Sequence, residues 1–285
     1  MNFTKMQGTG NDFIVIEPGG LKRNWKKLAI AMCDRHFGIG GDGLILVQPS
    51  KKADFRMRIL NADGSEAEMC GNGIRCMTVY LYYKELASRK NREVRIETLA
   101  GIKMVRPLKS RNRVTGARVG MGIPQFNAVK IPVSLPKSDR NELDIIPALC
   151  AIEVKGRGLL LHFVSMGNPH AVHFIEQSIS DFPLAELGSE IENNDLFPRR
   201  INFEVARIID RNNIEIAVWE RGSGITLACG TGACAVVVIS RLLGFTDETV
   251  NVFVPGGKLC VEWDRKGEVF LSGPAEVVFE GDWPD

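Results

Sequence analysis

The hydrophobic and polar positions along this chain follow two periods, and each period predicts one kind of element. Short apolar or alternating runs predict strands, as at residues 55–60 and 214–219. Longer runs with apolar residues three or four positions apart predict helices at residues 74–86 and 233–243. Strand-like runs occur throughout the chain, so we expect an α+β protein rich in strands.

Two further helices are expected from their capping signals. Asn24 precedes a segment whose Trp25, Leu28 and Met32 share one face, and Asp181 precedes a helix expected at residues 183–191. A side chain of this type accepts a hydrogen bond from an otherwise unpaired N–H of the first turn. We therefore predict that Asn24 and Asp181 are N-caps.

The most informative feature is a loop that occurs twice. Polar residues are followed by Cys-Gly-polar-Gly and an apolar helical run, at residues 70–73 and again at residues 229–232. Upstream, residues 10–13 (Gly-Asn-Asp-Phe) resemble residues 167–170 (Gly-Asn-Pro-His). The asparagine at position 11 lies 59 positions before the first cysteine, and the one at position 168 lies 61 positions before the second. We infer two similar α+β domains that face each other, with one cysteine from each at the cleft.

The length of 285 residues allows one large domain or two ordinary ones. Prolines at positions 124, 132 and 136 lie in a stretch with little helical pattern, and they predict the crossing between the domains. The first domain is therefore expected to span residues 1–125 and the second residues 126–273.

Each copy of the loop places a cysteine, Cys70 or Cys229, at the start of a helix. The unpaired N–H groups and the positive end of the helix dipole stabilise an anion there, so we expect both thiols to lose a proton more readily than free cysteine. A thiolate and a thiol on opposite walls of a cleft could remove a proton from one face of a carbon and return one to the other face, which inverts the stereocentre. The next N–H groups could hold a carboxylate and stabilise enolate-like charge, namely those of Gly71, Asn72, Gly230 and Thr231.

Three more polar residues are candidates for this chemistry. Glu220 and Arg221 end a predicted strand before a glycine-rich loop. A surface ion pair is the simplest interpretation, but the loop favours Arg221 binding a carboxylate and Glu220 meeting an ammonium group. His170 lies in an Asn-Pro-His turn, where it could tune the pKa of a nearby thiol.

The composition excludes several classes of partner. Hydrophobic content of 45%, charged content of 25% and a net charge of +2 are typical of a soluble globular protein without a polyanionic partner, so neither nucleic acid nor a membrane is expected. The longest apolar runs are too short to span a bilayer, and no signal peptide is recognisable. Seven cysteines is an odd number, which predicts reduced thiols in the cytoplasm.

A metal or redox role for the cysteines is the competing hypothesis. Cys70 and Cys76 are six positions apart, and Cys229 and Cys234 are five apart, so each pair points to different sides of its helix and does not match a zinc motif. We expect no metal and no pyridoxal cofactor. The remaining cysteines are expected to be buried structural residues, namely Cys33, Cys76, Cys150, Cys234 and Cys260.

These motifs together resemble the diaminopimelate epimerase family, and the resemblance runs from Met1 to the final strands. It implies a cofactor-independent isomerase that interconverts LL- and meso-diaminopimelate for lysine and cell-wall synthesis. It also implies two pseudo-symmetric domains, each a barrel-like, mostly antiparallel sheet around a central helix, with residues 274–285 returning to the first domain. The expected partners are a small-molecule substrate and, as a candidate assembly, a second copy in a homodimer.

The resemblance also assigns roles to individual residues. Cys70 and Cys229 would be the acid/base pair, and His170 and Glu220 would adjust the pKa values of the thiols. Glu220 would also bind the distal amino group of the substrate. Backbone donors would come from Gly71, Asn72, Gly230 and Thr231, and side-chain contacts to the substrate from Asn11, Asn61, Asn168, Asn202 and Arg221.

The sequence departs from the family at two positions. Ile225 replaces a common acidic residue, and Gly43 replaces a glutamine that touches substrate in some members. A proline or hydroxyproline racemase, with the same fold and two-thiol chemistry, is the nearest alternative. The two charged residues Glu220 and Arg221, with the four asparagines, fit a substrate with a second charged end better than a small cyclic one.

Overall fold

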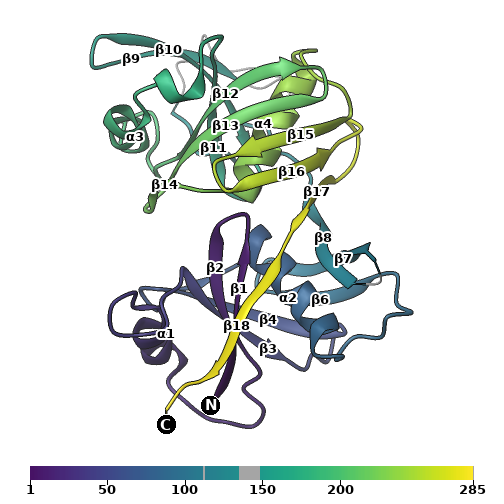
Figure 1. Cartoon of the computed structure of the whole chain (residues 1–285). Coiled ribbons are helices and arrows are strands. Elements are labelled where there is room, and N and C mark those ends of the chain that lie inside the picture. The colour runs from purple at the N-terminus through teal and green to yellow at the C-terminus, as the bar shows by residue number, and fades with distance from the viewer. Residues whose placement is uncertain (112, 135–147, 285) are drawn as a thin grey trace. The chain divides into compact units, whose positions relative to one another are not determined.

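The computed structural model describes residues 1–111, 113–134 and 148–284. The chain divides into two compact units (Figure 1). Unit 1 consists of Met1–Gly120 and Ser272–Asp285, and unit 2 consists of Met121–Leu271. Two strands, β8 (Arg113–Gly122) and β17 (Val269–Pro274), contain the positions where the chain passes from one unit to the other.

The remaining elements of unit 1 are strands with two helices between them. The helices are α1 (Trp25–Cys33) and α2 (Gly71–Tyr83). The strands are β1 (Asn2–Gly8), β2 (Asn11–Ile16), β3 (Gly43–Gln48), β4 (Phe55–Asn61), β5 (Glu66–Ala67), β6 (Val94–Thr98), β7 (Gly101–Ser110) and β18 (Glu276–Asp282).

Unit 2 is built in the same way. Its helices are α3 (Leu184–Glu192) and α4 (Gly230–Leu242), with a short 3₁₀ turn at Ile179–Asp181. Its strands are β9 (Leu149–Val154), β10 (Arg157–Ser165), β11 (Pro169–Phe174), β12 (Asn202–Asp210), β13 (Asn213–Glu220), β14 (Gly224–Thr226), β15 (Thr249–Val254) and β16 (Gly257–Glu262).

The strand pairings of the two units match one for one. In unit 1, β1 pairs antiparallel with β2, β2 parallel with β3, β3 antiparallel with β4, β4 parallel with β6, and β6 antiparallel with β7. The series β10, β11, β12, β13, β15 and β16 repeats this alternation in unit 2. The short strands β5 and β14 add to β4 and β13, and each precedes the helix that starts at a cysteine. The predicted α+β fold of two pseudo-symmetric, mostly antiparallel domains is confirmed.

Each sheet carries helices on both of its faces, and this burial explains the sequence pattern. In unit 1, α1 packs against one face through a cluster that includes Ile14, Leu44 and Leu60. Helix α2 covers the other face and is buried over nearly its whole length. Strands covered on both faces need apolar residues at consecutive positions, which is why β2 and β3 read as continuous apolar runs. Helix α4 is the equivalent buried central helix of unit 2.

The two predicted N-caps have different outcomes. Asn24 caps α1, and its side chain accepts a hydrogen bond from the backbone N–H of Lys27 at 3.1 Å, as predicted. The prediction for Asp181 is wrong, because this residue lies in the 3₁₀ turn and the N-cap of α3 is Pro183. Proline suits a helix start because the first turn leaves N–H groups unpaired in any case.

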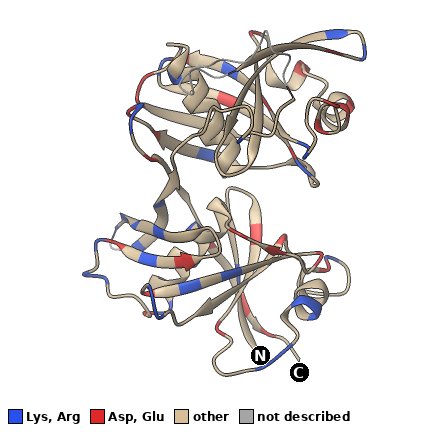
Figure 2. Cartoon of the chain, turned by 180° about the vertical axis from the view of Figure 1, so that it is seen from behind, with Lys and Arg blue, Asp and Glu red and all other residues tan. Residues whose placement is uncertain are grey.

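Positively and negatively charged residues are interspersed along the chain in each unit (Figure 2). This distribution agrees with the small net charge of the chain, +2. Among the described residues, no helix is both long enough and apolar enough to cross a membrane.

Candidate active site

Cys70 is the N-cap of α2, the central helix of unit 1. The residue has an extended backbone, and its sulfur accepts a hydrogen bond from the backbone N–H of Gly73 at 3.4 Å. A Cβ atom at position 73 would lie 3.1 Å from the side chain of Ile59 and 3.3 Å from that of Ile45. The glycine therefore lets the first turn of the helix approach the sheet closely, which fixes the position of the thiol.

Polar side chains surround this thiol. The amide oxygen of Asn11, at the start of β2, lies 3.8 Å from the sulfur of Cys70 and accepts a hydrogen bond from Nδ2 of Asn72 at 3.1 Å. Arg75 is completely buried one turn further along α2. It donates to the side-chain oxygen of Asn72 at 2.9 Å and to the carbonyl of Gly71 at 3.1 Å. We call these five residues, Asn11, Cys70, Gly71, Asn72 and Arg75, the unit 1 cysteine site.

A charged network holds Asn11 from the side away from the thiol. Nδ2 of Asn11 donates to Asp42 at 2.5 Å, and Arg35 bridges Asp42 and Asp12 at 2.8 and 2.7 Å. Burial by itself would raise the pKa of Asp12, but hydrogen bonds from Arg35 and Lys5 outweigh it and lower the pKa to about 2. The carboxylate is therefore ionised at neutral pH, which anchors the turn that carries Asn11.

Asn61 ends β4, and its Nδ2 donates to the hydroxyl of Ser65 at 2.9 Å within the loop that leads to Cys70. Gly43 pairs with Asn61 across β3 and β4. A Cβ atom at position 43 would lie 2.8 Å from the carbonyl oxygen of Leu60, so a larger residue here would require the backbone of β3 or β4 to shift.

Cys229 occupies the corresponding position in unit 2. It is the N-cap of α4, and its sulfur accepts a hydrogen bond from the backbone N–H of Gly232 at 3.4 Å. The sulfur also lies 3.4 Å from the hydroxyl of Thr231, which accepts a hydrogen bond from Nδ2 of Asn168 at 3.1 Å. Thus, in both units, an asparagine at or immediately before the start of a strand contacts the residue two positions after the cysteine.

A buried acid lies behind this arrangement. The carboxylate of Glu204, on β12, is 2.7 Å from Nδ1 of His170, and both side chains are fully buried. Nε2 of His170 is 3.0 Å from the amide oxygen of Asn168, so a chain of contacts runs from Glu204 to Thr231 and Cys229. A Cβ atom at position 232 would lie 2.7 Å from Glu204, which explains the glycine there. Together with Gly230 and Glu220, these residues form the unit 2 cysteine site.

The electrostatics at Cys229 correct one expectation. We predicted a lowered pKa from the helix N-terminus, and for Cys229 this is wrong. Burial raises the pKa of the thiol well above its usual value, and the negative charges of Glu220 and Glu204 raise it further. Hydrogen bonds from Thr231 and the N–H of Gly232 oppose this rise and are outweighed. Cys229 therefore carries its proton at neutral pH.

Glu220 and Arg221 lie at the end of β13, as expected. The hydroxyl of Thr226 donates to Glu220, and burial raises the pKa of Glu220 despite that hydrogen bond. Arg221 donates from its guanidinium to the carbonyl of Arg199 at 3.1 Å, and its backbone N–H donates to the side chain of Asn202 at 2.9 Å. Asn202 is buried and thereby ties this loop to β12.

The other cysteines fit the structural role expected of them, with one exception. Cys33, Cys76, Cys150 and Cys234 are buried, whereas Cys260 is partly exposed. Burial raises the pKa of Cys33 to about 11 and that of Cys76 to about 12, so these thiols are not acid/base groups at neutral pH. Within the described part of the chain, no group of three or more His, Cys, Asp or Glu side chains is arranged to hold a metal ion.

Comparison with known proteins identifies the family. The sequence profile of diaminopimelate epimerases matches residues 3–126 and 162–278, which together make up most of the chain. The chain belongs to the diaminopimelate epimerase family. A diaminopimelate epimerase from Carboxydothermus hydrogenoformans is 46% identical over 287 residues, and one from Methanococcus maripaludis is 43% identical over 286 residues. In both cases the alignment covers 99% of each chain.

Two solved structures share the fold at much lower sequence identity than these members of the family. A probable proline racemase from Agrobacterium radiobacter has a TM-score of 0.71 at 15% identity, covering 99% of this chain and 92% of that chain. A hydroxyproline epimerase from Agrobacterium vitis has a TM-score of 0.69 at 15% identity, covering 99% of this chain and 91% of that chain. These likenesses show the fold alone.

The sequence motifs did not identify two buried residues of the cysteine sites, Arg75 and Glu204. The sequence did contain a signal for each, because Arg75 interrupts the apolar run of a central helix and Glu204 lies in a strand that is otherwise apolar around it. A charge within a buried element requires a partner. Which partner it finds depends on contacts between elements far apart in sequence.

Proposed function

We propose that this chain is a two-thiol epimerase that interconverts LL- and meso-diaminopimelate by proton transfer at one α-carbon, in the synthesis of lysine and peptidoglycan precursors. The observation that carries the proposal is the matched pair of helix N-cap cysteines, one in each unit, in a member of the diaminopimelate epimerase family. We further propose that the two cysteine sites act on the same substrate molecule.

The protonation of Cys229 suggests how the reaction starts. Because Cys229 holds its proton at neutral pH, it is the acid at the outset and Cys70 is the base. The sulfur of Cys70 takes the α-proton, the electron pair of the C–H bond stays on the α-carbon as a carbanion, and Cys229 donates its proton to the opposite face. The reaction leaves Cys70 protonated and Cys229 as the thiolate, which is the starting state for the reverse direction.

The helix N-termini supply the charge stabilisation that this carbanion needs. Backbone N–H groups at the first turns of α2 and α4, those of Gly71, Asn72, Gly230 and Thr231, would hold the carboxylate on the reacting carbon and the charge that delocalises into it. Arg221 would bind a distal carboxylate and Glu220 a distal ammonium group. The asparagines at positions 11, 61, 168 and 202 would complete the polar contacts with a substrate charged at both ends.

A substrate comparison in heavy water tests the proposal against the proline racemase alternative. The purified protein is incubated in D₂O with diaminopimelate or with proline, and deuterium at the α-carbon is followed by NMR. We expect incorporation and epimerisation with diaminopimelate only. Exchange with proline, and none with diaminopimelate, would contradict the proposal.

Three finer features are proposed with this activity: that no pyridoxal cofactor is required, that the location is cytoplasmic, and that the active species is a homodimer. Their support is the family of the chain alone. Activity of extensively dialysed protein without an absorption band from a pyridoxal group tests the first. Fractionation of the source cells tests the second, and the mass by light scattering of the active fraction tests the third.

A further inference from the structure

Glu192, the last residue of α3, is a buried acid that no step of the proposed reaction uses. One carboxylate oxygen accepts a hydrogen bond from the indole Nε1 of Trp219 at 2.7 Å, and the other accepts one from the backbone N–H of Gly222 at 2.9 Å. Arg200 reaches the same carboxylate at 3.4 Å from a largely exposed position. Glu192 therefore has well-defined donors for both of its oxygens.

The donors of these two hydrogen bonds, Trp219 and Gly222, flank the dipeptide Glu220-Arg221 in the sequence. Trp219 immediately precedes Glu220, and Gly222 immediately follows Arg221. A single carboxylate thus holds the side chain before, and the backbone after, the two residues proposed to bind the distal charges of the substrate. Gly222 has a positive φ of 77°, a turn conformation that few other residues adopt readily, so the direction of the chain after Arg221 is also fixed.

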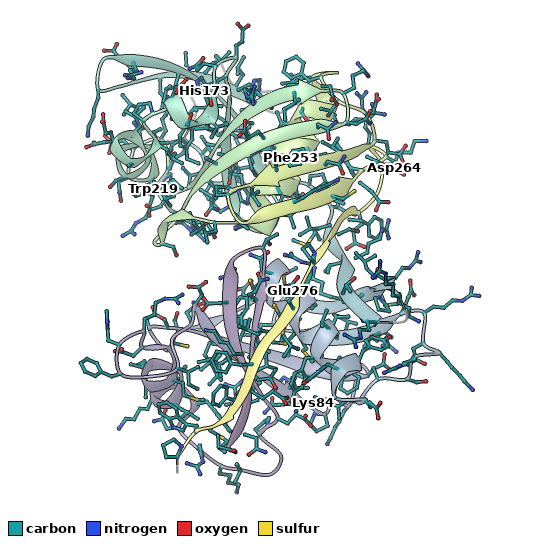
Figure 3. All side chains as sticks on the ribbon, in the orientation of Figure 1. Lys84, His173, Trp219, Phe253, Asp264 and Glu276 are labelled. Carbon is teal, nitrogen blue, oxygen red and sulfur yellow. The ribbon has the colours of Figure 1, made fainter. Side chains whose placement is uncertain are left out.

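The packing of α3 strengthens this connection. A Cβ atom at position 188, one turn before Glu192, would lie 2.3 Å from the indole ring of Trp219, so the ring lies directly on the helix backbone at Gly188. Trp219 is at the side of unit 2 next to α3 (Figure 3). Helix α3 therefore holds the tryptophan both by ring contact and by the hydrogen bond from Glu192.

The energetics favour a role in positioning over a gain in stability alone. A buried carboxylate is costly to remove from water, and hydrogen bonds with one partly exposed cation rarely repay this cost with a large surplus. Hydrogen bonds to a charged group are nevertheless short and directional, so they restrict the geometry of the loop that donates them. Such restriction matters most where the loop contacts a ligand.

We propose that Glu192 is a positioning residue that sets the orientation of Glu220 and Arg221 for binding the distal end of the substrate. This inference rests on the proposed epimerase activity and on the assignment of Glu220 and Arg221 to substrate binding. Loss of the hydrogen bonds from Trp219 and Gly222 to Glu192 weakens the contacts with a remote part of the substrate, while the thiols and their helix N-termini are unchanged.

The test is the kinetics of Glu192→Gln with diaminopimelate, beside Trp219→Phe and the control Glu190→Gln. Glutamine keeps the size of the side chain but replaces one carboxylate oxygen with an NH₂ group. This group cannot accept the hydrogen bond from the indole of Trp219 or the backbone N–H of Gly222. Phenylalanine at position 219 removes only the indole donor. Glu190 is on the same helix, is largely exposed and pairs with Lys155 at the surface, so its substitution changes charge without touching the loop.

We expect Glu192→Gln to raise KM about tenfold, equivalent to about 1.4 kcal/mol, with kcat changed less than about threefold, because a contact of equal strength in ground and transition states is weakened. Trp219→Phe raises KM by a smaller factor, and Glu190→Gln leaves both constants at their wild-type values. If Glu192→Gln is too unstable to assay, the rise in KM for Trp219→Phe decides the question.

The results that overturn the inference are distinct from those that overturn the proposed function. An active wild-type protein whose Glu192→Gln variant keeps the wild-type KM contradicts the positioning role. A fall in kcat together with a lower melting temperature, at unchanged KM, also contradicts it and shows a purely structural residue. A wild-type protein that does not epimerise diaminopimelate overturns the proposed function and this inference together.

Discussion

The two cysteine sites share a backbone arrangement but differ in the charge buried behind it. In unit 1 the completely buried side chain next to the thiol is a cation, Arg75, which donates to the first turn of α2. In unit 2 the corresponding buried groups are the acid Glu204 with His170, and Glu220 adds a second carboxylate. The repeated fold thus supplies two similar thiols, and the buried charges make them unequal.

This inequality has a chemical consequence. A two-base inversion needs one thiolate and one thiol at the same time, and two identical sites would not distinguish between them. Burial, and after it the carboxylates of Glu220 and Glu204, raise the pKa of Cys229 and keep it protonated. The repeated fold therefore gives the two thiols similar backbone positions, whereas the groups buried behind the helix starts give them different electrostatic surroundings.

Removing either thiol gives the largest expected effect. Cys70→Ala and Cys229→Ala should each lower kcat by at least about 10³-fold. Each removes a proton-transfer group that contributes about 10² to 10⁴ in rate, and the remaining thiol reaches only one face of the α-carbon. Epimerisation measured by chiral chromatography, with circular dichroism as a check of folding, decides this. Cys76→Ala and Cys234→Ala serve as controls inside the same helices and should keep their activity. Near-full turnover by either catalytic variant would refute the two-thiol account.

Arg75→Met tests the unit 1 side of the comparison. We expect kcat/KM to fall about 100-fold, equivalent to about 2.7 kcal/mol, because Asn72 and the carbonyl of Gly71 lose their donor beside Cys70. The melting temperature should fall as well, since buried acceptors are left without partners. Arg58→Met, at a partly exposed pair with Glu66, is the matched control and should lose little activity. If Arg75→Met kept the wild-type kcat/KM, the buried cation would have no role in the function of Cys70.

Glu220→Gln tests the unit 2 side through the pKa of Cys229. The carboxylate raises this pKa, so its removal should lower it, and the thiol should ionise at lower pH. In a Cys70→Ala background, the pH profile of Cys229 alkylation by iodoacetamide should move down by on the order of one unit. Glu215→Gln on the same strand should leave the profile in place. A shift to higher pH would contradict the assigned sign.

Thr231→Val is expected to have the smallest effect. It removes the hydroxyl that connects Asn168 with Cys229 but keeps the shape of the side chain. The loss of the hydrogen bond to the sulfur, worth about 1 kcal/mol, predicts a fall in kcat of about fivefold. Steady-state kinetics measure this, and Thr249→Val, at an exposed position on β15, is the control. An unchanged kcat would show that the chain of contacts ends before the thiol.

Much of this arrangement was readable in the sequence. The doubled Cys-Gly-polar-Gly loop predicted two helix-start cysteines, and both are N-caps. The resemblance to the diaminopimelate epimerase family is confirmed by the sequence profile and by relatives more than 40% identical. These features are predictable because a cap and a helical period depend on residues close together in the chain.

The buried charges and their effect could not be predicted in the same way. The pKa of Cys229 depends on Glu204, which reaches the thiol region from another strand, and on the exclusion of water by the whole unit. A helix N-terminus alone favours the thiolate, and only the assembled structure shows that burial and two carboxylates outweigh it. The prediction that Asp181 is the N-cap of α3 is wrong for a related reason, because a 3₁₀ turn forms at Asp181 in place of the predicted helix start.

The central claim is that two thiols act on opposite faces of one carbon, and the isotope content of substrate and product in the first moments of reaction tests it most directly. LL-diaminopimelate is incubated with the protein in D₂O, and both epimers are analysed by mass spectrometry before equilibrium. We predict that the meso product carries deuterium at one α-carbon while the remaining LL substrate keeps its hydrogen. Deuterium entering the unreacted substrate as fast as the product, or a product that retains the original hydrogen, would contradict two separate proton-transfer groups.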